Sequence, residues 1–422
     1  MNSLAKVLFL CLFLPLFSTA AGGEEVDTRQ RCMSPDFKTL RVLVNGRNDL
    51  PAVLVAGSND VLTISFDELA TEARFLRWSL THCDADWVPE NISDFEFTDG
   101  MNEATVDKYE FSQATLTHYV HYTITVPDKR IPLKLSGNYL LKVYEEYKPE
   151  NPLLQVRFSV VENNLKVNAH VSPRTDIDYL GQHQQLDITV DTDGSNLRNP
   201  YTDLTTLVYQ NPRDNTVVKL TSPSMVNGKT INYSHLRPLI FPGSNEYRRF
   251  ETVSTSYPGI GIERTWHSAD GYFADLFIDT PRYSAGYTYD RTQRGSFTVR
   301  EYNSSESDTE AEYIITNFRL ESPKLPVEVH IDGELTFHAL DSSTLMDYNH
   351  ESGCYEKSLL LKQGAYDYRY VTKNPRTDKI STDMTEGNFC DTSNRYVIYV
   401  YYRLPGERFD RLGGVTCAEL HK

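Results

Sequence analysis

Apolar and polar residues alternate along most of this chain. The alternation is strict in three segments: 154–160, 165–171 and 186–190. A period of two places one face of a strand in a hydrophobic core and the other face in water, which is typical of antiparallel sheet. The same period recurs at Tyr366, Tyr368 and Tyr370. Helical periodicity is weak by comparison, so we predict an all-β protein.

Turn signals separate the predicted strands. Asn-Gly or Asp-Gly pairs stand at 45–46, 99–100, 193–194, 227–228, 270–271 and 332–333. These residues readily adopt the positive φ angles that tight hairpins require. Many short strands with frequent turns predict stacked antiparallel β-sandwiches of the immunoglobulin-like type.

Two breaks in the pattern divide the chain. A polar step at 162–164 follows a completed strand, and prolines bracket the segment 321–326. The polar run 303–310 is interpreted as a long hairpin loop rather than a boundary. We therefore predict three consecutive β-sandwich domains, over residues 22–162, 163–322 and 323–422.

The first 21 residues have the layout of a cleaved signal peptide. Lys6 precedes an apolar run over 7–17, and small residues follow over 18–21. The run is shorter than the roughly 20 residues that a membrane-spanning helix needs. Leu10 stands where a lipoprotein signal has a small residue before its cysteine, here Cys11. We expect export without a lipid anchor, and no later stretch is apolar enough to span a membrane as a helix.

Charge and cysteine content narrow the function classes. The formal net charge of −16 argues against a nucleic-acid partner, because no excess of basic residues is available to neutralise phosphates. Five cysteines follow the predicted signal peptide: Cys32, Cys83, Cys354, Cys390 and Cys417. An exported protein can form disulfides, and the odd number leaves at least one thiol unpaired. Two interpretations remain, a Cys354–Cys390 bridge or five free, buried thiols.

Familiar catalytic motifs do not occur in the sequence. It contains no Gly-x-Ser-x-Gly elbow, no complete Gly-x-x-x-x-Gly-Lys-Ser/Thr phosphate-binding loop and no His-Glu-x-x-His pair. His118 and His121 are three residues apart in a predicted strand, so they point to opposite faces and cannot share a metal ion. We expect neither enzymatic activity nor a bound cofactor or metal.

Two stretches are unusually dense in polar and aromatic residues. The first, 78–87, holds the candidate contact residues His82, Asp84, Asp86 and Trp87. A thiol beside an imidazole and two carboxylates could supply a nucleophile or a calcium loop. The structural interpretation is that the two tryptophans anchor a core while the aspartates cap a turn, and we favour it.

The second dense stretch is 241–250, with the candidates Asn245, Glu246 and Arg248. These side chains could form a recognition cluster on a turn. They could equally tie that turn to its own domain by bonding backbone groups that would otherwise lack partners. We favour the structural interpretation here too.

Both stretches belong to a longer series of motifs. In chain order the series is 81–87, 97–100, 135–144, 209–212, 241–250, 346–348, 361–366, 399–403 and 410–412. It resembles the plug protein family of the type IX secretion system of Bacteroidota, over nearly the whole chain after the signal peptide. The resemblance implies a periplasmic protein that docks under the outer-membrane translocon barrel and closes its periplasmic mouth. It supplies no active site and no cofactor.

The last predicted domain suggests a rival function. Residues 327–335 resemble the opening strand and turn of immunoglobulin-like modules that bind glycogen and starch. Those relatives have a sugar-stacking tryptophan shortly after the glycine, where this chain has Thr336, Phe337 and His338. We therefore interpret the domain as a protein-contact module. A carbohydrate-binding or carbohydrate-active envelope protein is the alternative, followed by an adhesin.

Overall fold

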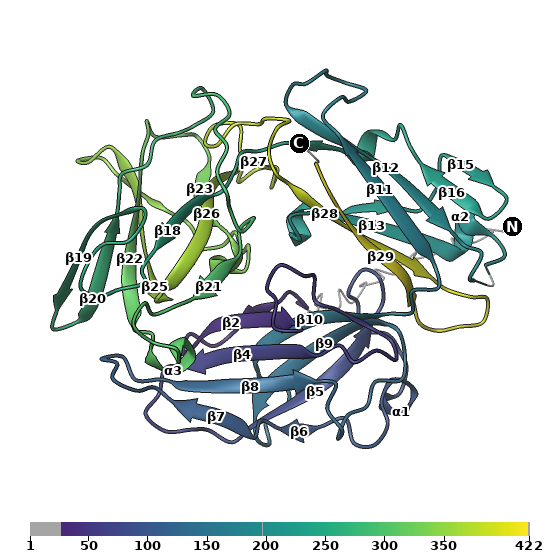
Figure 1. Cartoon of the computed structure of the whole chain (residues 1–422), viewed down its shortest axis with the longest axis horizontal. Coiled ribbons are helices and arrows are strands. Elements are labelled where there is room, and N and C mark those ends of the chain that lie inside the picture. Colours follow the sequence, from purple (N-terminus) through teal and green to yellow (C-terminus); the bar gives the residue numbers. More distant parts are fainter. Residues whose placement is uncertain (1–26, 196, 421–422) are drawn as a thin grey trace, which may run out of the picture.

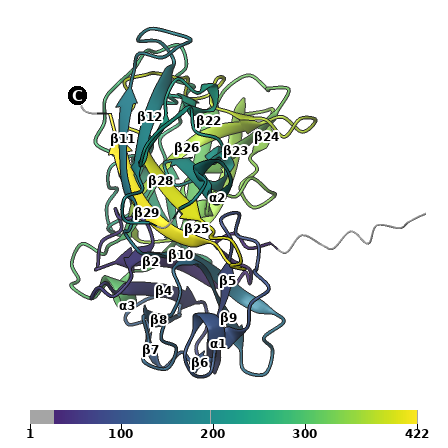
Figure 2. The ribbon, with the colours of Figure 1, turned by 90° about the vertical axis from the view of Figure 1, so that its right-hand side faces the viewer.

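The computed structural model describes residues 27–195 and 197–420, and this part of the chain is mostly β. The signal peptide predicted over 1–21 lies outside the described residues. Figure 1 shows the strands gathered into three groups around a centre, and in Figure 2 one group lies below the other two. We call them the first unit (27–162), the second unit (163–243 and 394–420) and the third unit (244–393).

The first unit contains two facing sheets. One sheet has the order β1 (Arg31–Cys32), β10 (Pro152–Val161), β9 (Gly137–Glu145), β5 (Leu76–Cys83) and β6 (Ala104–Thr105), with β3 (Val53–Val55) beside β10. The other has the order β2 (Phe37–Val44), β4 (Leu62–Glu68), β8 (Val120–Val126) and β7 (Lys108–Phe111). The single-turn helix α1 (Asp94–Phe97) follows β5.

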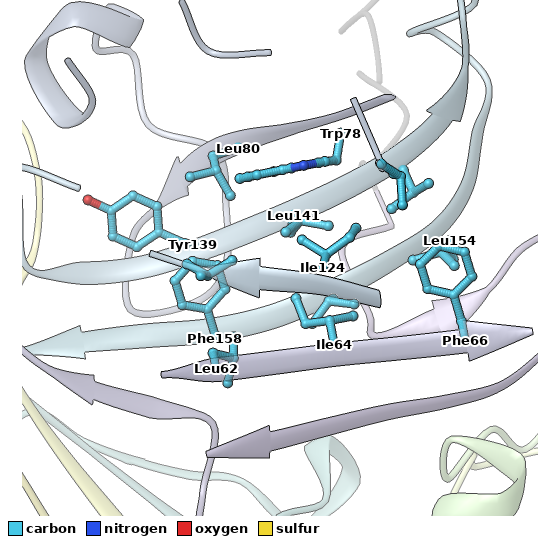
Figure 3. Close-up of a cluster of buried hydrophobic side chains, with 14 of the residues drawn as sticks. Leu62, Ile64, Phe66, Trp78, Leu80, Ile124, Tyr139, Leu141, Leu154 and Phe158 are labelled. Carbon is cyan, nitrogen blue, oxygen red and sulfur yellow. The ribbon is translucent and has the colours of Figure 1, made fainter. Parts of the chain in front are cut away.

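The core of the first unit lies between these sheets. Figure 3 shows side chains from both sheets meeting there, among them Ile64 and Ile124 from one and Trp78 and Phe158 from the other. The Trp78 side chain is fully buried, and Tyr139 stacks on Phe158 with ring centroids 5.3 Å apart. Aromatic side chains bury much apolar area each, which makes this a stable sandwich centre.

The second unit is also a pair of sheets, but its strands come from two distant parts of the chain. One sheet has the order β11 (Lys166–Ser172), β12 (His183–Asp191), β16 (Thr230–Tyr233) and β15 (Met225–Asn227), with β17 (Ile240–Pro242) paired to β12. The other has the order β14 (Val218–Leu220), β13 (Leu204–Gln210), β28 (Arg395–Tyr402) and β29 (Arg411–Glu419). Three single turns complete the unit: α2 (Pro200–Asp203), η1 (Asp214–Thr216) and η2 (Arg237–Leu239).

The third unit again has two sheets around one core. The first sheet centres on β26 (Gly364–Lys373), which pairs with β18 (Arg248–Glu251), β21 (Phe297–Val299), β23 (Glu328–Asp332) and β27 (Ile380–Ser381). The second has the order β19 (Ile262–Ser268), β20 (Gly271–Leu276), β22 (Tyr313–Glu321), β25 (Cys354–Lys362) and β24 (Asp347–Asn349). Two short turns, α3 (Ser307–Glu310) and η3 (Glu334–Thr336), lie in its connections. None of the helices described in the three units is long and apolar enough to cross a membrane.

The cores do not follow the predicted division after residue 322. Strand β22 ends at Glu321 and pairs along its whole length with β25, so the segment 321–326 connects strands of one unit. Strands β28 and β29 return to the second unit, where β28 pairs with β13 and β29 pairs with β28. The third unit is thus an insertion within the second unit, whereas the sequence predicts three domains that follow one another along the chain. Two pairs, β3 with β10 and β20 with β22, are parallel, whereas the sequence predicts antiparallel sheets.

The five described cysteines are all free, so the predicted Cys354–Cys390 bridge is wrong. Cys354 begins β25 in a sheet of the third unit, whereas the Cys390 backbone N–H donates to Gly181 O of the second unit at 3.0 Å. Burial raises the pKa of the Cys83 thiol to about 12, which makes it unreactive. The alternative of five buried thiols fails at Cys417, which is exposed.

Candidate functional site

The three units meet at three joints, and the first dense stretch forms one of them. The loop after β5 (residues 82–90) contacts the connection between β28 and β29 (residues 403–412) in the second unit. Asp410 Oδ2 accepts a hydrogen bond from Ala85 N at 2.9 Å, and Glu90 Oε1 accepts one from Asp410 N at 2.7 Å. Arg403 Nη2 lies 3.1 Å from the same Glu90 oxygen. These bonds link the first unit to the second.

His82 supports this loop from inside. Its Nδ1 lies 2.6 Å from Glu90 Oε2 and its Nε2 lies 3.0 Å from Ser136 O. The side chain is 1% exposed, so it has no surface to offer a partner. A buried imidazole that bonds through both nitrogens is positioned to hold Glu90 in place.

The two aspartates of the loop have different roles. Asp84 Oδ1 accepts hydrogen bonds from Asp86 N and Val88 N, both at 2.9 Å. This is the turn-capping arrangement of the structural interpretation. Asp86 is exposed and forms an ion pair with Lys219 of the second unit. Neither aspartate belongs to a group of three or more ligand-type side chains, and the described residues contain no such group that could hold a metal ion.

Trp87 lies at the tip of the loop with a positive φ of 63°. Such a conformation is uncommon for a bulky residue, and strained positions often accompany function. The Arg157 guanidinium carbon lies 4.6 Å from the Trp87 ring centroid. Trp87 is half-buried and faces the centre of the molecule, where it lines a cleft.

The second dense stretch lies beside the joint between the second and third units, where Gln184 Nε2 of the second unit donates to Cys390 O and Thr392 O at 2.7 and 2.8 Å. Within the second unit Asn394 Nδ2 donates to Gly243 O at 2.7 Å, and within the third Asn245 Nδ2 donates to Glu386 O at 3.0 Å. Glu246 Oε1 accepts from Ser393 N at 2.9 Å. Asn245 and Glu246 are each 2% exposed. Their side chains therefore secure the turn, as the structural interpretation predicts.

Arg248 is the charged centre of the second dense stretch, and its partners belong to the third unit itself. Its Nε lies 3.0 Å from Glu386 Oε1 and its Nη1 lies 2.6 Å from Asp279 Oδ1. The guanidinium carbon is 5.3 Å from the Tyr370 ring centroid. Burial alone would lower the pKa of Arg248, but the two carboxylates outweigh it and hold the pKa above its ordinary value. The side chain is 10% exposed.

The joint between the first and third units contains a buried ion pair. Lys362 Nζ lies 2.6 Å from Asp67 Oδ2, and the two side chains are 1% and 0% exposed. His121 Nδ1 and the Tyr313 hydroxyl bond the same carboxylate at 2.6 and 2.7 Å. Burial alone would raise the pKa of Asp67, but Lys362 and His121 outweigh it and lower that pKa. His118 precedes β8 and is exposed.

A central cleft of about 870 Å³ lies where the three units face one another. Trp87 and Arg157 come from the first unit, Tyr209 and Tyr399 from the second, and Arg291 from the third. Clefts at the junctions of structural units are common binding sites. The sequence pattern missed this one because its walls come from segments far apart in the chain.

Comparisons with known proteins agree with this architecture. Residues 37–162, which nearly span the first unit, match the family model described as "Type 9 secretion system plug protein 1st domain". None of the curated protein sequences matches the chain.

A solved structure matches almost the whole chain. It is the crystal structure of a hypothetical protein from Parabacteroides merdae, with 36% sequence identity and a TM-score of 0.92, covering 94% of this chain and 100% of that one. An alkylpurine DNA glycosylase from Pseudomonas fluorescens aligns over 30% of each chain at 11% identity, and its TM-score of 0.17 is too low to indicate a shared fold.

The architecture is an assembly of three β-sandwich units, in which the first dense stretch joins the first unit to the second. The chain belongs to the family of type 9 secretion system plug proteins.

Proposed function

We propose that this protein docks on the outer-membrane translocon barrel of the type IX secretion system and closes its periplasmic opening. The observation that carries the proposal is the match of the first unit to the first domain of the plug family. In this proposal the protein is periplasmic, held at the inner face of the outer membrane by its partner, and catalyses no reaction.

The joints support a role as a stopper. A plug must resist deformation, and three sandwiches tied pairwise into a closed ring cannot swing independently. The buried Asp67–Lys362 ion pair joins the first and third units, so sliding of one unit against the other would break a bonded pair of buried charges. Stable docking of such a body requires an interface larger than about 1,000 Å².

An affinity pulldown of the tagged protein from solubilised outer membranes of its native host tests the proposal. We expect mass spectrometry to identify the translocon barrel in the eluate. The same tag on an unrelated exported β-sandwich is the control. Failure to recover the barrel from membranes that contain it would count against docking. Recovery of glycans or surface polysaccharide proteins in its place would favour the carbohydrate-binding alternative.

A further inference from the structure

The central cleft carries more positive charge than the rest of the protein. Five arginines that line the cleft outnumber the carboxylates that pair with them: Arg29, Arg31, Arg291, Arg294 and Arg395. This excess lies in a chain whose formal net charge is −16. It is therefore a local property of the cleft.

Two carboxylates serve four of these arginines. Arg29 and Arg31 both bond Asp27 Oδ2, at 2.8 and 2.6 Å. Arg294 of the third unit and Arg395 of the second share Glu419, at 2.6 and 2.7 Å. Each pair therefore keeps an unneutralised charge.

Arg291 is the fifth arginine of the cleft. Its side chain is exposed and forms no ion pair with any described carboxylate. A free guanidinium at the wall of a cleft can bind an anion without breaking an existing bond.

The acidic residues of the cleft wall do not cancel this charge, because they have partners of their own. Asp49 Oδ2 lies 2.7 Å from Arg47, and Asp214 Oδ2 lies 2.7 Å from Arg157. Asp378 Oδ1 lies 3.6 Å from Lys373, and burial raises the pKa of Glu334.

Aromatic rings lie between the charged walls. Tyr209 and Tyr399 contact each other edge to face with centroids 5.6 Å apart, and Trp87 lines the cleft on the facing unit. Tyrosine and tryptophan offer rigid, partly polar surfaces against which a polypeptide can pack. Arginine forks match carboxylates in a bidentate geometry.

We propose that the cleft binds an extended acidic segment of another polypeptide, with its carboxylates on the free arginine donors and its backbone along the aromatic rings. One arginine pair belongs to the first unit and the other to the second and third units, and the pairs share no carboxylate. This arrangement suits anionic groups spaced along a chain better than one compact polyanion. This binding goes beyond docking on the barrel and does not depend on it.

Fluorescence anisotropy with a short fluorescein-labelled peptide of alternating glutamate and serine tests the proposal on the full exported chain. We expect saturable binding that weakens as salt is added, because partly exposed charges are screened. The same peptide with glutamine in place of glutamate should bind at least about tenfold more weakly. Equal binding of the two peptides, or binding of neither, would overturn the proposal.

A matched pair of variants locates the site. Arg291→Glu should weaken binding of the glutamate peptide by about tenfold or more. Arg300→Glu makes the same charge change on an exposed residue of the same unit that does not line the cleft, and should leave binding nearly unchanged. An equal effect of both variants would mean that only overall charge matters, which contradicts a site in the cleft.

Trp87 provides a second, label-free measurement. Trp78 is buried in a core and Trp266 lies on the third unit, so a fluorescence change on addition of unlabelled peptide that disappears in Trp87→Phe must come from the cleft. Complete displacement of the peptide by inorganic phosphate at constant ionic strength would assign the cleft to small anions instead. Recovery of the barrel by Arg291→Glu would show that docking is a separate property.

Discussion

Two charge pairs that join units of this protein differ sharply in their surroundings. Lys362 and Asp67, between the first and third units, are 1% and 0% exposed, whereas Lys219 and Asp86, between the first and second, are 42% and 50% exposed. Both pairs are a lysine with an aspartate. A buried charge that loses its partner remains without solvent, but an exposed one is taken up by water. Loss of one partner should therefore lower the free energy of unfolding much more at the buried pair than at the exposed pair.

The largest effect is expected when the buried pair is broken on one side. Lys362→Met should lower the free energy of unfolding by about 4 kcal/mol, because it leaves the Asp67 carboxylate buried with too few partners. Urea unfolding at neutral pH measures the change. Adding Asp67→Asn to Lys362→Met should recover part of the loss, and a double variant as unstable as the sum of its parts would contradict this account.

Arg248 extends the comparison to a buried charge cluster inside the third unit. Arg248→Met should cost about 3 kcal/mol, since it removes the cation of Asp279 and leaves the buried Glu386 with Arg282 alone. Arg249→Met is the matched control, because Arg249 is the next residue of β18, is 38% exposed and faces Asp290 at 3.4 Å. Thermal unfolding distinguishes the two. An Arg248 variant of unchanged stability that no longer binds the barrel would identify Arg248 as a docking residue.

The buried carboxylates should also make the free energy of unfolding depend on pH. The pKa values of Asp67 and Glu386 are lowered, so their stabilisation is present above the ordinary values near 4 and is lost as the pH falls below them. We expect a loss of about 2 kcal/mol between pH 5 and pH 3, measured by urea unfolding across this range. Asp67→Asn should show a shallower slope, and an identical slope would exclude Asp67 as a source.

The exposed pair defines the smallest expected effect. Asp86→Asn should change the free energy of unfolding by less than about 1 kcal/mol. The difference from the parent protein should shrink further in high salt, because exposed charges are screened. Paired urea titrations at low and high salt test this. A loss as large as that of Lys362→Met would show that burial does not determine how much each ion pair contributes to the free energy of unfolding.

The sequence predicted strands well where one side of a sheet meets a core. In β12 the residues Leu186, Ile188 and Val190 are buried while Asp187 is exposed, as period-two alternation requires. In β10 the same alternation misled, because Gln155 and Ser159 on the polar side are also buried. On that face Gln155 bonds the segment 27–29 of the first unit, and Ser159 bonds Asn138, which in turn bonds Tyr401 of the second unit. Alternation carries no information about what covers a polar face.

Among the candidate residues, local contacts could be predicted from the sequence and long-range contacts could not. The capping role of Asp84 follows from local chemistry and was predictable, since an aspartate bonds backbone groups two and four residues ahead. The partners of Glu246 and Arg248 include Ser393 and Glu386, more than 130 positions along the chain. Long-range partners of this kind depend on the return of the chain to the second unit, which no local pattern encodes. The central cleft was missed for the same reason.

The insertion of the third unit has a consequence for how the protein is made. A chain that emerges from its amino end can complete the first unit at once, but β13 must wait for β28, which begins at Arg395. Until then β13 has an unpaired edge, and such edges invite association with other chains.

The third unit shortens that wait by bringing its own ends together. Asn394 and Gly243, on either side of the insert, are hydrogen-bonded at 2.7 Å. Once the insert folds, the effective loop between β13 and β28 is short. The entropic cost of bringing these two strands together is then smaller, because folding of the insert has already brought its ends close. Folding of the third unit should therefore favour completion of the second, which occurs when β28 pairs with β13.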